Sequence, residues 1–180
     1  MKSDVIKINN GGKGFEKALA ETKKIAAYRE LSGKDVLHLE LITEEMLSLV
    51  RSVTGEMDGS FWIEADGAQY DLHLTTQTVM DKEKRNLLIS SASSRKNEAA
   101  KTFLGYLRNA FEEAMITEAN HSNDDIPEDA LDDLYNHPIE IEDDQQWDGY
   151  ERSVLRKVAD NVKIAIRGGV VDMTVSKSIA

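Results

Sequence analysis

Two stretches of this sequence alternate apolar and polar residues on either side of a glycine-containing turn, and this pattern constrains the fold more than any other feature. The first surrounds Asp66-Gly67 and the second surrounds Gly168-Gly169, both of which are strong hairpin turn signals. The apolar positions of the first are Phe61, Ile63, Ala65, Tyr70, Leu72 and Leu74, and those of the second are Val162, Ile164, Ile166, Val171, Met173 and Val175. One buried face and one wetter face predict an antiparallel sheet with helices on a single side.

The remaining periodic segments predict the other elements. Residues 5–8 favour a short strand. Residues 15–31 favour a helix that Gly33 would end, and a second helix runs from Asp35 to Gly55. Further helices are predicted over residues 82–91, 97–116 and 151–159. The order predicts an α+β fold, namely a two-layer α/β sandwich with helices over a mixed, mostly antiparallel sheet.

The size and composition indicate a soluble protein. A chain of 180 residues is typical of one domain, so we expect residues 1–180 to form a single domain. We find neither the roughly 20-residue apolar run that a membrane span needs nor the apolar core of a signal peptide. The expected location is therefore the cytoplasm, and we expect no membrane partner. The absence of cysteine excludes disulfides and thiolate metal sites.

The net charge of −11 comes from one segment. Residues 118–148 hold twelve acidic residues and no Lys or Arg, which predicts a mobile acidic insertion. Such a segment repels nucleic acid and favours a protein partner. It would dock on a basic partner or fold back as a self-inhibitor. Its carboxylates lack the spacing of a calcium loop, so no metal site is predicted.

The helix sequence LITEEMLSLVRSV, residues 41–53, carries the first sign of a family. With the order of elements, it resembles the histidine-kinase-like ATPase (GHKL) superfamily, and within it the bacterial anti-sigma-factor serine kinases. The family carries a Glu and, four residues later, an Asn that ligates the Mg²⁺ of ATP. The apolar stripe aligns Glu45 with the Glu and Leu49 with the Asn. Leucine offers no oxygen ligand to Mg²⁺. The alternative register pairs Glu44 with Ser48, which supplies only a weak hydroxyl ligand.

Two other family motifs are degenerate. The stretch LHLTTQTVMD stands where the family has Asp-x-Gly-x-Gly, and it lacks both glycines. The stretch DGYERSVLRKVADNV, in place of a glycine-rich phosphate turn, holds only Gly149. The resemblance implies a histidine-kinase-like ATPase fold whose nucleotide site is largely lost, with no cofactor expected.

A basic cluster gives a separate candidate site. Arg95 and Lys96 precede Asn97, a residue type suited to begin a helix. A helix start flanked by cations favours phosphate or an acidic partner, so these three residues are a candidate anion site.

These observations predict a regulatory protein-binding module that does not turn over ATP. The alternative is an ATP- and Mg²⁺-dependent, anti-sigma-factor-like serine kinase with Glu45 as its catalytic base. The pattern leaves the oligomeric state open.

Overall fold

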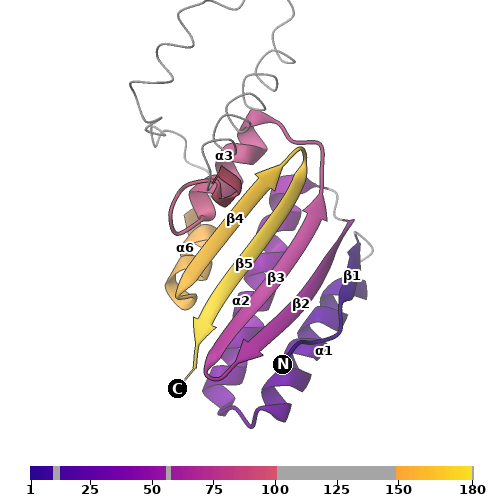
Figure 1. Ribbon diagram of the computed structural model, residues 1–180, viewed down its shortest axis with the longest axis vertical. Helices are drawn as coiled ribbons and strands as arrows, with labels where there is room; N and C mark the ends of the chain where they lie inside the picture. Colours follow the sequence, from indigo (N-terminus) through magenta and orange to yellow (C-terminus); the bar gives the residue numbers. More distant parts are fainter. Residues whose placement is uncertain (10–12, 56–57, 101–148, 180) are drawn as a thin grey trace, which may run out of the picture.

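The protein folds around a five-stranded sheet in which every pairing is antiparallel (Figure 1). The structure is a computed structural model that describes residues 1–9, 13–55, 58–100 and 149–179. The strands are β1 (Ile6–Asn9), β2 (Asp58–Asp66), β3 (Gln69–Gln77), β4 (Asn161–Arg167) and β5 (Val170–Ser178). Their order across the sheet is β1-β2-β3-β5-β4. Both predicted hairpins are confirmed, whereas the predicted mixed character is absent from the described strands.

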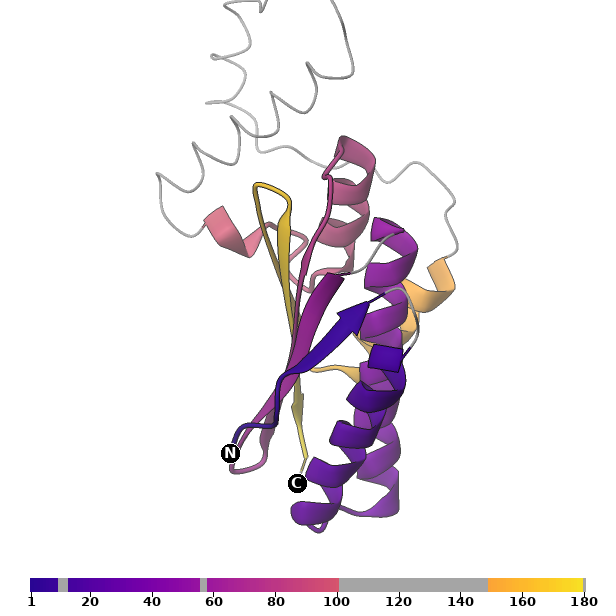
Figure 2. The same cartoon turned by 90° about the vertical axis from the view of Figure 1, so that its right-hand side faces the viewer.

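Helices cover one side of this sheet. They are α1 (Lys13–Tyr28), α2 (Gly33–Thr54), α3 (Lys82–Ser91) and α6 (Gly149–Val158). A separate 3-10 helix, η1, spans Glu98–Ala100. Figure 2 shows α1 and α2 side by side on the same face of the sheet. The predicted α+β class with a helical layer on a mostly antiparallel sheet is therefore confirmed.

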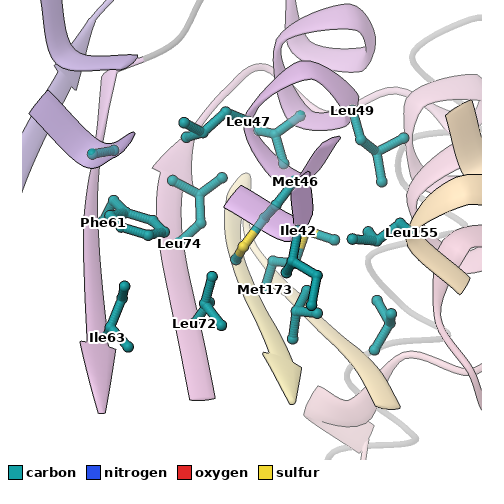
Figure 3. Close-up of a cluster of buried hydrophobic side chains, with 14 of the residues drawn as sticks. Ile42, Met46, Leu47, Leu49, Phe61, Ile63, Leu72, Leu74, Leu155 and Met173 are labelled. Carbon is teal, nitrogen blue, oxygen red and sulfur yellow. The ribbon is translucent and has the colours of Figure 1, made fainter. Parts of the chain in front are cut away.

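Alternation along the strands places the core between the two layers. Phe61 lies opposite Leu74, and Ile63 lies opposite Leu72. All four side chains are buried. Figure 3 shows them facing Ile42 and other aliphatic residues of α2. Burial of this continuous apolar layer is the main force that joins helices and sheet.

Local signals set the ends of α2. Ser32 lies just before the helix, where its Oγ accepts a hydrogen bond from the Asp35 backbone N–H at 3.3 Å. Gly55 follows the last turn with φ +70°, and its N–H donates to the Arg51 carbonyl. Both are common end signals, and the predicted end at Gly55 is confirmed.

The predicted end of the first helix was wrong. The helix α1 stops at Tyr28, and Gly33 is instead the first residue of α2. Glu30 takes the left-handed conformation (φ +54°) that glycine normally supplies at a helix end. The backbone N–H of Leu31 then donates to the Ala26 carbonyl at 3.0 Å, which closes the last turn without glycine.

Some predictions fall on residues that the structure does not describe. The predicted helix over 97–116 is described only through η1, and the acidic segment 118–148 lies outside the described residues. The role proposed for that segment therefore stays a prediction. Among the described helices, none is both long enough and apolar enough to cross a membrane.

Candidate functional site

The side of the sheet opposite the helices carries polar side chains around one tryptophan. We call this surface the open face. It is defined by residues of the four longer strands whose side chains alternate with the core: Ser60, Trp62, Glu64, Asp71, His73, Thr75, Lys163, Arg167, Asp172 and Thr174. No described α-helix covers its middle (Figure 2). A polar face of this kind is what an antiparallel sheet presents to water or to a partner.

A row of side chains crosses the centre of the open face from strand to strand. Trp62 lies opposite His73, which lies opposite Thr174. The two rings stack with centroids 4.9 Å apart and planes 9° from parallel. The Nδ1 atom of His73 lies 3.1 Å from the Thr174 hydroxyl, at hydrogen-bonding distance. The register therefore builds an ordered aromatic pair where a sheet surface would otherwise carry independent side chains.

Charged groups also contact the Trp62 ring. The Lys2 ammonium lies 5.1 Å from the ring centroid and 2.9 Å from the Glu64 carboxylate. The same carboxylate accepts a hydrogen bond from the Trp62 indole N–H at 3.2 Å. Contacts to Lys2 and Trp62 lower the pKa of Glu64 from its usual value. We call Lys2, Trp62, Glu64 and His73 the Trp62 cluster.

The surroundings of His73 disfavour protonation of its imidazole. Burial lowers the pKa of its imidazole, and this effect outweighs the Glu64 and Asp71 carboxylates, which raise it. Lys2 adds to the lowering. The Nε2 atom is buried without a hydrogen bond and lies 3.9 Å from Glu64. The neutral ring is therefore the form that fits the cluster.

A second row strengthens the same face. The Thr75 hydroxyl donates to the Asp172 carboxylate across the β3–β5 pair at 2.7 Å. Lys7 of β1 donates to the Ser60 hydroxyl at 2.9 Å. These cross-strand bonds order the surface that surrounds the Trp62 cluster.

Residues 92–97, which we call the edge turn, cover the outer edge of β4. The backbone N–H of Ser93 donates to the Val162 carbonyl, and the Ser93 hydroxyl accepts from the Val162 N–H, both at 2.8 Å. The Asn97 amide pairs in the same way with Ile166, at 3.0 and 2.9 Å. An uncovered edge strand invites pairing with other chains, and the edge turn removes this hazard from β4.

This arrangement separates Asn97 from the other two residues of the predicted anion site. Asn97 is buried, and its side-chain oxygen also accepts from the Ala99 N–H at 3.1 Å, as expected of a residue that begins a helix. Its amide is directed into β4, so it is not presented with Arg95 and Lys96, which are both exposed. The described helix after it has three residues, Glu98–Ala100.

The residues tied to the ATPase resemblance lie on α2. Leu49 is only 4% exposed and belongs to the hydrophobic core. Figure 3 shows it on the side of α2 where Leu155 of α6 lies. Glu45 is half-buried one turn earlier. Aliphatic side chains therefore surround the position where the resemblance would require a magnesium ligand.

Sequence reasoning missed the Trp62 cluster. The alternation along the hairpin leaves Trp62 and His73 off the core face, but it does not by itself join them. The Asp66-Gly67 turn fixes the register that puts the two rings opposite each other, so a signal was present. Among the described residues, no group of three or more His, Asp or Glu side chains is arranged to hold a metal.

The chain was compared with known proteins. Neither a scan against protein-family models nor a search of curated proteins gave a match.

Proposed function

We propose that this protein is a regulatory protein-binding module that recognises its partner through the open face and does not turn over ATP. The observation that carries the proposal is the burial of Leu49 in an aliphatic core. Mg²⁺ requires oxygen ligands, and α2 offers a hydrocarbon side chain at the position that the histidine-kinase-like resemblance assigns to its ligand. The leucine at this position favours a degenerate nucleotide site. We therefore assign recognition of the partner protein to the surface of the molecule.

The Trp62 cluster supports the open face as that surface. Tryptophan is among the residues that most often dominate binding energy at protein interfaces. The stack with His73 and the contacts to Lys2 and Glu64 already order the indole ring. A side chain that is ordered before binding loses little conformational entropy when a partner covers it.

The test compares partner capture by the full chain and by matched surface variants. Trp62→Ala removes the ring from the open face, whereas Tyr28→Ala removes a ring that is 75% exposed at the end of α1. We expect Trp62→Ala to lose the proteins captured from source-cell extract and Tyr28→Ala to keep them. Melting curves of both variants report whether the fold is intact.

Two outcomes would contradict the proposal. Capture that survives Trp62→Ala would remove the open face as the recognition surface. Mg²⁺-dependent transfer of phosphate from ATP to a partner serine, abolished by Glu45→Gln, would instead establish the kinase alternative.

A further inference from the structure

The residues before β1 continue along the edge of β2. The Ser3 N–H donates to the Ile63 carbonyl, and the Ala65 N–H donates to the Met1 carbonyl, both at 2.8 Å. We call residues 1–3 the strap. It occupies the part of the β2 edge that lies beyond the end of β1.

One extra residue separates the strap from β1. Lys2 lies opposite Glu64, whereas Ile6 lies opposite Phe61, so four steps along one chain segment match three steps along β2. Such a bulge interrupts the ladder and moves every side chain beyond it to the other face of the sheet. This shift brings Lys2 to the open face, where its ammonium lies over Trp62. The strap is therefore a unit separate from β1 that belongs to the Trp62 cluster.

The strap is a weak strand. The side chains of the Lys2–Glu64 ion pair are 55% and 47% exposed, and exposed pairs stabilise a fold little. Met1 is 52% exposed. Ser3 stands beside the buried Ile63, and its hydroxyl, in place of a backbone carbonyl, accepts from the Ile63 N–H at 2.8 Å. A segment with so little apolar burial opens locally at low cost.

We infer that an extended segment of the partner protein displaces the strap and pairs with β2 beside Trp62. A sheet edge binds extended peptides through its backbone groups, and alternate side chains give specificity. The segment that fits carries an apolar residue where the strap has Ser3, because that residue would pack on Ile63 across the strands. This inference rests on the proposed function and adds the kind of segment that the partner supplies.

The Trp62 ring keeps its order when the strap leaves. Its stack with His73 and its hydrogen bond to Glu64 come from β2 and β3. Displacement removes only the Lys2 ammonium from the ring. The ring and the β2 edge then form one continuous surface for the same partner.

A disulfide can lock the strap in place. Lys2 and Glu64 face each other between two hydrogen-bonded positions. The Cα atoms of such a pair lie about 4.5 Å apart, which a disulfide can span. The chain has no cysteine, so Lys2→Cys with Glu64→Cys would form one defined bond. The oxidised and reduced forms of this double variant differ in whether the strap is tied to β2.

A second variant loosens the strap. Ser3→Pro removes both the N–H that donates to Ile63 and the hydroxyl that accepts from it. The probe is a fluorescein-labelled peptide, Lys-Val-Thr-Val-Thr-Val-Glu, whose binding to the full chain is followed by fluorescence anisotropy. A control peptide has proline in place of its central valine and so lacks one backbone donor. Melting curves report whether each variant is folded.

We expect Ser3→Pro to bind the peptide with a Kd at least about fivefold lower than that of the wild type, because the strap competes less well. Oxidation of the double cysteine variant should raise the Kd at least about tenfold over the reduced form, and the proline peptide should bind more weakly than its parent. Equal affinities of the oxidised and reduced forms, absence of binding by folded Ser3→Pro, or equal binding of the two peptides would overturn the inference.

The proposed function fails separately from this inference. Partner capture that Trp62→Ala abolishes, but that oxidation of the double cysteine variant leaves unchanged, would overturn displacement of the strap and keep the proposed function. Peptide binding that oxidation abolishes, together with capture that survives Trp62→Ala, would overturn the open face as the recognition surface and keep the β2 edge.

Discussion

Replacing Leu49 by Asn tests how closed the interior between α2 and the sheet is. The substitution introduces at this position the residue type that the ATPase resemblance would require. Leu49 is 4% exposed, so the change removes nearly all the hydrophobic stabilisation of one leucine, about 1.5–3 kcal/mol. It also buries an amide among aliphatic groups, which adds about 1–3 kcal/mol when the amide finds no partner. We expect a total loss of about 3–5 kcal/mol in the free energy of unfolding.

Urea unfolding of the full chain, followed by circular dichroism, measures this loss. With a typical urea dependence of about 2 kcal/mol per molar, the midpoint should fall by about 2 M. Leu37→Asn is the matched control, because Leu37 lies on the same helix and is 65% exposed. Its effect should stay within about 1 kcal/mol, since it carries only the difference in helix propensity. Leu49→Met, which nearly conserves volume, should cost less than about 1.5 kcal/mol.

A Leu49→Asn variant as stable as Leu37→Asn would refute the reasoning. It would mean that residue 49 faces a polar space that accepts an amide. Such a result would restore the possibility of a nucleotide site on α2.

Three further predictions concern pH, the β4 edge and a turn. Burial lowers the pKa of His73 below its usual 6.5, so the neutral ring contributes fully to the free energy of unfolding above pH 6.5. This contribution falls as the pH drops toward the pKa of the folded protein. His73→Gln should therefore flatten this part of a stability–pH curve, and an unchanged curve would contradict the prediction. Asn97→Ala removes both side-chain hydrogen bonds to β4, so hydrogen exchange should become faster at the Ile166 amide. Urea unfolding should show a loss of about 1–3 kcal/mol in the free energy of unfolding. Unchanged exchange at Ile166 would contradict the proposed role of the edge turn in covering β4. Gly169→Ala should lower the melting temperature more than Gly67→Ala. Both glycines have positive φ, but of the two only Gly169 would place a Cβ against backbone, 2.6 Å from the Thr78 carbonyl oxygen. Equal losses in melting temperature would show that the turn relaxes.

Much of the fold was predictable because its signals are local. Alternation around Asp66-Gly67 fixed which residues of β2 and β3 face the core, and the predicted helix over residues 82–91 matches α3. The end of α1 was not predictable in this way. Glu30 adopts the left-handed conformation that sequence reasoning normally assigns to glycine. The hydrogen bond from the Leu31 N–H to the Ala26 carbonyl stabilises this conformation.

The candidate site was harder to predict because it depends on contacts between distant segments. The bond from His73 to Thr174 needs the β3–β5 pairing, which joins residues 101 positions apart. The role of Asn97 depends in the same way on Ile166, because the sequence does not show whether an Asn side chain begins a helix or bonds to the edge of a distant strand. Leu49 was the opposite case, because its place on the apolar stripe already indicated the burial that the structure shows.

The most direct test of the central claim is calorimetric titration of the full chain with ATP at millimolar concentration in the presence of Mg²⁺. A core filled at Leu49 predicts no saturable heat, and no rise in melting temperature in a parallel experiment with the same ligand. Saturable, Mg²⁺-dependent binding that Glu45→Gln weakens would contradict the claim that this chain works through its surface.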